Sequence, residues 1–148
     1  MFKISRSSFP GTYVPGSFER GEGDFELLHQ FCHAEGWSGD LSNGLFKLGE
    51  KTAQMHGLSQ RDCGLLHLMR CYDPADRTDV LELFEQAATV SSSFCYSTTI
   101  LLPDGRKQPV FCVGESSGLE QRYSGMILGT FLFPRFQVAG TSRLPLRQ

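Results

Sequence analysis

The chain has 148 residues, of which 40% are apolar and twelve are Phe, enough for one globular domain with a hydrophobic core. Its formal net charge of −2 argues against nucleic-acid binding, which requires a clustered basic surface. No apolar run approaches the roughly 18 residues of a membrane span, and the N-terminus lacks the apolar segment of a secretory signal. We therefore expect a cytoplasmic protein that binds neither nucleic acid nor membranes.

The five cysteines, at positions 32, 63, 71, 95 and 112, form no C-x-x-C pair. An odd number of cysteines without a secretory signal indicates reduced thiols rather than a disulfide framework. Free cysteine is among the most buried residue types, so we expect most of these side chains to be small core residues.

Residues 1–23 are rich in Gly, Pro and Ser, a composition that favours a flexible N-terminal arm over a packed element. The following segment, DFELLHQFCHAEG, predicts an amphipathic helix over residues 24–35, with Asp24 as its N-cap and Gly36 as its stop. The apolar face of this helix needs a partner, and we expect it to contribute to a homodimer interface. The candidate interface residues are Phe25, Leu28, Phe31 and Cys32.

Residues 36–135 are predicted to form the folded domain, and residues 136–148 a C-terminal tail. The domain begins with two short strands, Trp37–Leu41 and Leu45–Leu48, which flank the turn signal Ser-Asn-Gly. Because both strands are short and follow one another closely, we expect them to pair as a hairpin.

Three helical segments follow. Residues 50–59 predict one or two helical turns ended by Gly57, and the apolar residues 63–72 predict a second helix. The third helix begins at Asp73, which can accept hydrogen bonds from free backbone N–H groups, and Pro74 suits its first position. This last helix should run to about residue 89.

Three further strands are predicted in FCYSTTILL, QPVFCVG and YSGMILGTFLF. If Asp104-Gly105 is a two-residue hairpin loop, the numbers of paired residues sum to about 209. In that register Tyr96, Thr98 and Ile100 share a face with Phe111 and Val113, and this aromatic face should meet the helices. The other face also has few polar residues, which suggests that the N-terminal helix or another chain covers it. The sequence thus predicts an α+β fold, with a five-stranded antiparallel sheet and a helical crossover between strands 2 and 3.

Five segments of this chain follow one another in a familiar order. They are Trp37–Leu48, Met55–Leu58, Tyr72–Arg77, Pro103–Gly105 and Ile127–Gly129. With them the chain resembles the PAS domain superfamily, in particular its branch with a D-P-x-D-R helix start and a P-D-G hairpin, over about residues 36–133. The resemblance implies a sensory or regulatory module that acts by binding an unidentified signalling protein. We expect it to be a homodimer as well, because the apolar face of the N-terminal helix and the second sheet face, which has few polar residues, both need to be covered.

The chain departs from the family pattern at two places. Tyr72 stands where family members often have His. Phe133-Pro134-Arg135 replaces the Asp-Ile-Thr that many members carry before a signalling helix, and proline disfavours a continuous helix there. Only a short tail follows, so we expect a stand-alone module.

The inward faces of the predicted elements carry apolar side chains and a few hydroxyl groups, which suits both a small-molecule pocket and a solid core. Some PAS domains bind haem through a histidine in the helical crossover, which makes His67 the candidate ligand in a haem-binding alternative. The candidate pocket residues are Phe46, Leu48, Met55, Leu66, His67, Phe84, Tyr96, Thr98, Ile100, Phe111, Val113 and Phe131.

Other chemistry has less support in the sequence. His29 and His33 have the spacing of two metal ligands, but a third ligand is missing, so we predict no metal site. The reactive-cysteine motif of flavin-binding relatives is absent, and so is a Gly-x-Ser-x-Gly elbow. We therefore expect no cofactor and no enzyme. Two alternatives stay open: a sensor of haem or a small molecule, and a small α+β enzyme with a conical pocket around His67, Tyr96 or Asp40.

Overall fold

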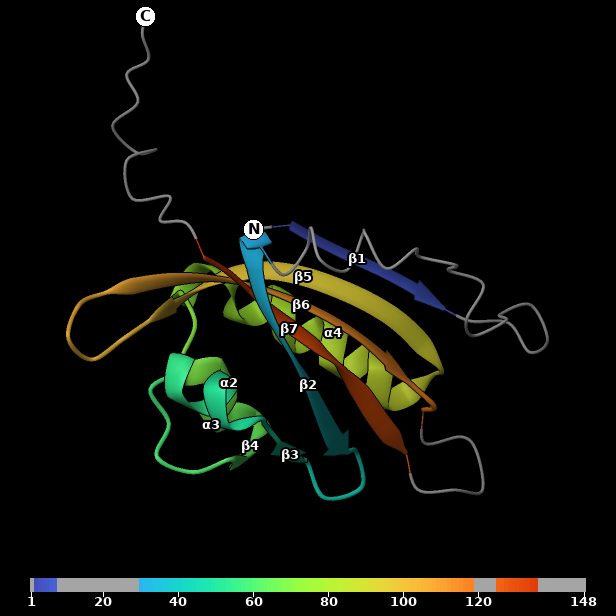
Figure 1. The fold of residues 1–148 in the computed structure, drawn as a ribbon. Helices are drawn as coiled ribbons and strands as arrows, with labels where there is room; N and C mark the ends of the chain where they lie inside the picture. The colour runs from blue at the N-terminus through green and yellow to red at the C-terminus, as the bar shows by residue number, and fades with distance from the viewer. Residues whose placement is uncertain (1, 8–29, 119–124, 136–148) are drawn as a thin grey trace, which may run out of the picture.

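The computed structural model describes residues 2–7, 30–118 and 125–135. These residues form one sheet in which all paired strands are antiparallel, in the order β1-β5-β6-β7-β2-β3-β4 (Figure 1). The strands are β1 (Phe2–Ser7), β2 (Cys32–Asp40), β3 (Leu45–Lys47), β4 (Asp62–Gly64), β5 (Ser92–Leu101), β6 (Lys107–Ser116) and β7 (Met126–Pro134).

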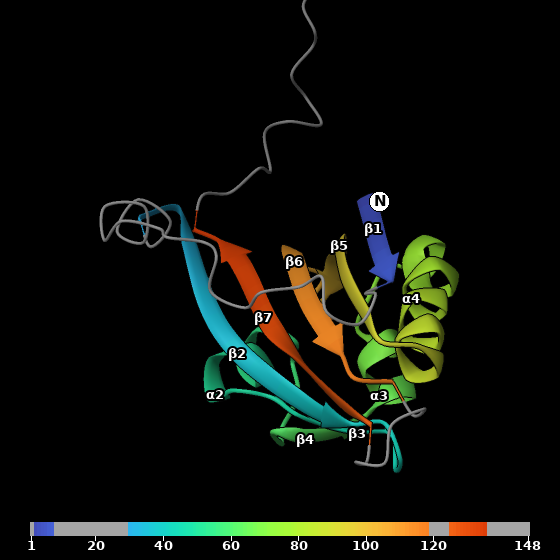
Figure 2. The ribbon, with the colours of Figure 1, turned by 90° about the vertical axis from the view of Figure 1, so that its right-hand side faces the viewer.

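The helices lie in the connection between β3 and β5. They are α2 (Glu50–Met55), α3 (Leu65–Arg70), the 3₁₀ turn η1 (Pro74–Asp76) and α4 (Arg77–Thr89). The sheet curls around these helices, so that they lie on its concave, inner side and its outer side faces away from them (Figures 1 and 2). The α+β class predicted from the sequence is therefore confirmed. Within the described part of the chain, no helix has both the length and the apolar character needed to cross a membrane.

Local sequence signals explain where the helices begin and end. The carboxylate of Asp73 accepts a hydrogen bond from the backbone N–H of Ala75 at 3.0 Å, and Pro74 occupies the first position of η1. Helix α4 ends at Thr89, as expected. After α2 the chain turns at Gly57, whose φ of +73° is readily adopted only without a Cβ.

The core lies between the inner face of the sheet and the helices, and aromatic rings dominate it. Trp37, Phe46, Phe84 and Phe131 are each at most 5% exposed. The Phe46 and Phe84 ring centroids are 5.4 Å apart, and those of Trp37 and Phe131 are 5.7 Å apart. Such contacts bury large apolar areas, so they are the main source of stability for this layer.

The N-terminal region differs from the sequence prediction. Residues 2–7, expected within a flexible arm, form β1 and pair with β5 at the edge of the sheet. Residues 32–35, expected to end a helix, form the start of β2 and pair with β7. Gln30 and Phe31 are helical, whereas residues 8–29 lie outside the described residues. The prediction failed because the spacing of apolar residues that fits a helix is also compatible with a strand. A strand forms where a long neighbouring strand can accept and donate the backbone hydrogen bonds, as β7 does here.

The number of strands was also wrong. The sequence predicted five strands, but β1 and β4 extend the sheet at its two edges. Strand β4 has three residues and pairs with β3. A segment this short carries no alternating pattern, so the sequence alone could not distinguish it from the start of the helix that follows.

The predicted register of the β5–β6 hairpin is wrong by one residue. Tyr96 pairs with Cys112 rather than with the expected Val113. The loop has three residues, Pro103 to Gly105, because Gly105 adopts a φ of +89° and the N–H of Leu102 donates to the Arg106 carbonyl at 2.9 Å. A slip of one residue moves every side chain of a strand to the other face, so Phe111 and Val113 lie on the outer face of the sheet.

Candidate functional site

A chain of hydrogen-bonded polar side chains crosses the aromatic core. His56 follows α2, Tyr72 precedes η1, and Tyr96 lies on the inner face of β5; all are at most 3% exposed. The Nδ1 atom of His56 lies 2.7 Å from the Thr52 carbonyl oxygen, and its Nε2 atom lies 3.1 Å from the Tyr72 hydroxyl. The Tyr72 and Tyr96 hydroxyl groups are 3.2 Å apart. We call His56, Tyr72 and Tyr96 the buried polar chain.

The hydrogen-bond directions along this chain follow from its chemistry. Burial lowers the pKa of His56 from 6.5 to about 4, an effect that the Thr52 carbonyl only partly offsets, so the imidazole is neutral at pH 7. A carbonyl oxygen can only accept, so the ring proton is on Nδ1 and Nε2 accepts from the Tyr72 hydroxyl. The Tyr72 oxygen is then free to accept a hydrogen bond from the Tyr96 hydroxyl.

The ionisable groups around this chain are held in their neutral forms. Burial raises the pKa of both Tyr72 and Tyr96 well above 10. Burial also raises the pKa of the neighbouring Cys112 thiol far above its usual value. At pH 7 the two phenols and this thiol therefore keep their protons and can donate hydrogen bonds inside the core.

The structure separates the candidate pocket residues into four groups. Leu66 is 66% exposed on α3 and His67 beside it is exposed, so neither faces the core. Phe111 and Val113 lie on the outer face because of the hairpin register, and Met55 is partly buried against the core. The remaining candidates are buried on the inner side: Phe46, Leu48, Phe84, Tyr96, Thr98, Ile100 and Phe131.

The buried group packs together with the polar chain. The centroid of the His56 ring lies 5.1 Å from that of Phe131, and the centroid of Tyr96 lies 6.1 Å from that of Phe84. Two shallow surface hollows, of about 270 and 370 Å³, lie beside Asp76 and beside Arg61. Neither hollow is lined by a member of the buried polar chain. The inner side thus brings aromatic side chains and hydrogen-bonded polar groups into contact with one another.

Sequence reasoning missed the residues at the centre of this arrangement. No sequence signal singled out His56 as a core residue, and Tyr72 stood out only as a departure from the family pattern. Cys112 and Val110 are fully buried on the inner face of β6. The register predicted from a two-residue loop had Phe111 and Val113 on that face instead. Gly105 of the P-D-G loop was the signal that could have predicted the inward position of Cys112 and Val110. Three-residue hairpin loops commonly end with Gly, and such a loop gives the observed register.

The structure describes only one histidine of the pair His29 and His33. His33 lies on β2, its ring stacks against Phe133 with the centroids 6.4 Å apart, and His29 lies outside the described residues. The buried Nε2 atom of His33 has no hydrogen-bond partner among the described residues. Within the same part of the chain, no three His, Cys, Asp or Glu side chains are placed to hold a metal ion.

The outer face of the sheet carries a group of exposed apolar side chains. Phe111 and Val113 on β6 and Met126 and Leu128 on β7 are between 41% and 50% exposed. The register joins them into one surface, because Phe111 pairs with Leu132 of β7, which lies on the same face. We call Phe111, Val113, Met126, Leu128 and Leu132 the outer apolar face.

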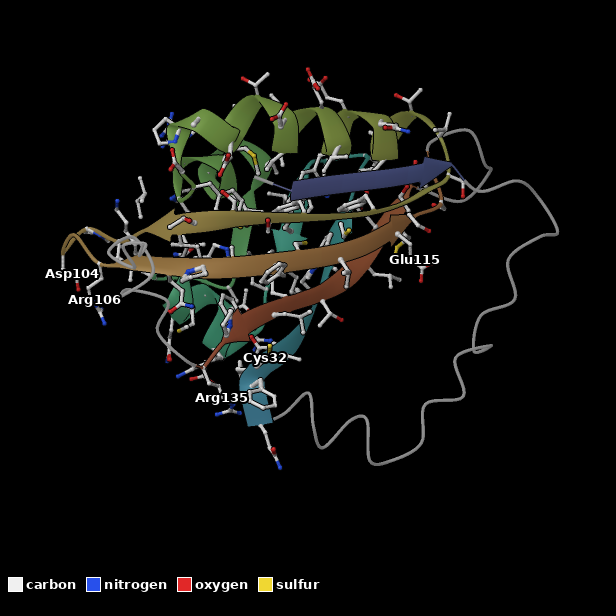
Figure 3. The ribbon with its side chains drawn as sticks, turned by 90° about the horizontal axis from the view of Figure 1, so that it is seen from above. Cys32, Asp104, Arg106, Glu115 and Arg135 are labelled. Atoms are coloured by element: carbon white, nitrogen blue, oxygen red, sulfur yellow. The ribbon has the colours of Figure 1, made fainter. Side chains whose placement is uncertain are left out.

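Charged residues lie at the two ends of this face. Glu115 lies at one end, and Arg135, which follows β7, lies at the other (Figure 3). Asp40 pairs with Met126 at the same end as Glu115, whereas Lys107 pairs with Leu101 at the opposite end. Lys47 of β3 pairs with Ser38, which is level with Leu128 and Glu115, so the end with Glu115 carries charges of both signs.

The predicted dimer residues are only partly described. Phe31 is 51% exposed, and its carbonyl oxygen accepts a hydrogen bond from the backbone N–H of Arg135 at 2.7 Å. Cys32 is partly buried and opens β2 beside Pro134. Phe25 and Leu28 lie outside the described residues. The two that are described are thus at the end of the outer face that carries Arg135.

Comparison with protein-family models finds no family that matches this chain, and comparison with curated proteins finds no significant match.

Proposed function

We propose that this chain is a PAS-like regulatory domain that acts by binding another protein through the outer face of its sheet. The order of elements supports the PAS-like assignment. Strands β2 and β3 pair, the helices follow, and β5, β6 and β7 return as a meander beside β2. This is the order expected from the resemblance, with β1 and β4 added at the edges.

The exposure of the outer apolar face is the observation that carries the proposal. Monomeric proteins seldom leave contiguous apolar patches of more than a few hundred Å² in water, and larger ones usually mark interaction sites. Four of the five residues are more than 40% exposed, although they lie in the middle strands of the sheet. A protein partner would remove them from water.

The inner side supports a role without catalysis. Its tyrosines stay protonated at pH 7, and the basic Nε2 atom of the neutral His56 already accepts a hydrogen bond from the Tyr72 hydroxyl, so the buried polar chain offers no free nucleophile or base. The enzyme alternative relied on His67, Tyr96 or Asp40. His67 is exposed, Tyr96 belongs to the buried polar chain, and the Asp40 carboxylate accepts from the backbone N–H of Ser42 at 2.8 Å.

A small-molecule sensor is the second candidate function, and the buried polar chain favours it. Imidazole and phenol groups inside an apolar core are the kind of groups that orient a ligand. A haem held by His67 has less support because that side chain faces solvent. An absorption spectrum and a native mass of the freshly purified protein would separate this candidate from the first, since a retained ligand adds mass.

Site-specific photo-crosslinking in cells tests the proposed interaction. A photoreactive phenylalanine analogue at Leu128 samples the outer apolar face, and the same analogue at the exposed Glu85 of α4 is the matched control. We expect a discrete crosslinked protein band from position 128 and none from position 85. No adduct at position 128, or the same adducts at both positions, would contradict the proposal.

A further inference from the structure

We infer that the partner proposed above binds by adding an extended strand of its own to residues 32–37 of β2, which we call the open edge. This inference rests on the proposed function, because it names the way in which that partner is held beside the outer apolar face. Three observations on the described residues lead to it: the length of β2, the direction of its backbone groups, and the position of the open edge beside the outer apolar face.

The first half of β2 has a neighbouring strand on one side only. Strand β2 pairs with β7 over its whole length, but it pairs with β3 only over residues 38–40. Within the described residues, no strand pairs with the other side of residues 32–37, and Figure 2 shows the start of β2 at the margin of the sheet. The hollow of about 370 Å³, lined in part by Gly36, Trp37 and Gly49, marks the place where β3 leaves β2. The open edge is about 20 Å long, enough for one added strand.

Two hydrogen bonds show which backbone groups of β2 face the open edge. The N–H of Leu41 donates to the Gly125 carbonyl at 2.8 Å, and the Phe31 carbonyl accepts from the N–H of Arg135 at 2.7 Å. Both bonds point towards β7. Successive residues of a strand direct their backbone groups to alternate sides, so the odd-numbered residues of β2 bond to β7. The residues that direct N–H and C=O groups to the open edge are therefore Cys32, Ala34 and Gly36.

The open edge has none of the usual features that prevent a sheet edge from pairing. Natural edges are commonly protected by proline, lysine, a bulge or a very short strand. The segment CHAEGW contains neither Pro nor Lys, and its pairing with β7 is continuous. The carboxylate of Glu35 is held on the helix side, where it accepts from the N–H of Thr52 at 2.6 Å. By contrast, β4 at the margin of the same sheet has only three residues. The open edge is thus suited to strand addition.

The surroundings of the open edge specify the chemistry of the partner strand. Because Trp37 points inward, the small residues Cys32, Ala34 and Gly36 lie on the outer face, and Ala34 pairs with Leu132 of the outer apolar face. An added strand would lie about 10 Å from β7, so large side chains could reach Leu132 across these small residues. We therefore expect apolar side chains at alternate residues of the partner strand, on its outward side.

The position of α2 favours another protein over a second copy of this chain. The N–H groups of Lys51 and Thr52 donate to the Glu35 carboxylate, so the start of α2 lies against the inner side of the open edge. Two copies that paired their open edges would each bring an α2 to the same side of the same two strands. An extended segment of another protein brings no such helix.

Amide hydrogen exchange of the purified full chain, followed residue by residue by NMR, tests whether the edge is open. We expect the Ala34 and Gly36 amides to exchange at least about a hundredfold faster than those of Glu35 and Trp37, which bond to β7 and serve as matched controls. Slow exchange at Ala34 and Gly36 would overturn the inference, because the edge would then be occupied already. Exchange that slows with protein concentration would identify a second copy as the occupant, and exchange independent of concentration a segment of the same chain.

Selection from a phage library of random short peptides tests the partner chemistry. We expect the selected peptides to carry apolar residues at alternate positions. Methylation of every second backbone nitrogen should weaken binding by at least about tenfold in one of its two phases only, since one set of N–H groups faces the edge. Ala34→Pro, which removes an N–H of the open edge but no bond to β7, should weaken binding similarly, and Ala34→Ser is the matched control that keeps the N–H.

The outcomes separate this inference from the proposed function. Failure to select alternating peptides, or equal effects of the two methylation patterns, would overturn strand addition even if Ala34→Pro does not fold. Peptide binding that is lost with Leu128→Lys but unchanged by Ala34→Pro would also overturn it, while leaving the outer apolar face as the binding site. Peptides bound at the open edge without any crosslink at Leu128 would instead contradict the proposed function.

Discussion

The Nε2 atom of His56 lies 3.1 Å from the hydroxyl group of Tyr72, and both side chains are at most 3% exposed. The two residues come from separate turns, one after α2 and one before η1. Their hydrogen bond joins two separate segments of the helical connection inside the core. Because both groups are buried, each depends on the other to satisfy its hydrogen-bonding capacity.

The stability of the protein should depend on pH through His56. Its pKa is lowered from 6.5 to about 4 in the folded state, so the unfolded chain binds a proton first as the pH falls. Stability is therefore lost between pH 6.5 and pH 4, by roughly 3 kcal/mol at most, and this contribution changes no further below both values. Urea unfolding at several pH values measures it.

The variant His56→Gln should show a smaller loss of stability over the same pH range, because its amide does not titrate. The matched control His67→Gln should keep the wild-type dependence, since it leaves the buried polar chain intact. Equal pH dependence of the wild type and His56→Gln would show that His56 does not lose its proton on burial.

The two tyrosines of the buried polar chain should differ in their contributions. Tyr72→Phe removes the donor to His56 and the acceptor for Tyr96, which leaves two buried groups without partners and should cost about 2–3 kcal/mol. Tyr96→Phe leaves the Tyr72–His56 hydrogen bond intact and should cost about 1 kcal/mol. The free energies of unfolding of the two variants test this order. A larger cost for Tyr96→Phe would contradict the direction of donation that we assign.

Gly129 should not tolerate alanine. A Cβ at this position would overlap the Val113 carbonyl oxygen and lie 2.9 Å from Nε1 of Trp37, so backbone of a neighbouring strand would have to move. We expect Gly129→Ala to cost about 3 kcal/mol or more in unfolding free energy. Gly36→Ala is the matched control on the adjacent strand, where the nearest atom would be an ordinary 3.7 Å away. Similar melting temperatures for the two variants would refute the close approach.

Glu35 should stabilise the start of α2. Its carboxylate accepts from the backbone N–H of Thr52 at 2.6 Å and of Lys51 at 3.4 Å. Burial raises the pKa of Glu35, but these hydrogen bonds outweigh that effect and hold the pKa below 4.5. The stabilisation is thus present above pH 4.5 and is lost as the pH falls through the folded-state pKa.

We expect Glu35→Gln to lower the melting temperature by a few degrees at pH 7, with a difference that shrinks in acid. Glu50→Gln, in the first turn of α2, is the matched control for charge without this contact, and its effect should be smaller. A difference between Glu35→Gln and wild type that stays constant down to low pH would argue against a role for the charged carboxylate.

Local chemistry determined several features that the sequence alone could predict. The cap at Asp73, the end of α4 at Thr89, the turn at Gly57 and the hairpin around Asp104 depend on residues close together in the chain. The alternation of apolar residues also identified the long strands β5, β6 and β7. These signals were sufficient for the α+β class, because each element is stabilised in part by its own sequence.

Only the tertiary structure decided which faces and which residues meet. The loop conformation at Gly105 set the hairpin register and moved Phe111 and Val113 outward, and pairing with β7 made a strand of residues that could have continued a helix. His56 and Tyr72 meet because the helical connection folds back on itself. Such features depend on contacts between distant segments, whose free energy outweighs a local preference of less than about 1 kcal/mol per residue.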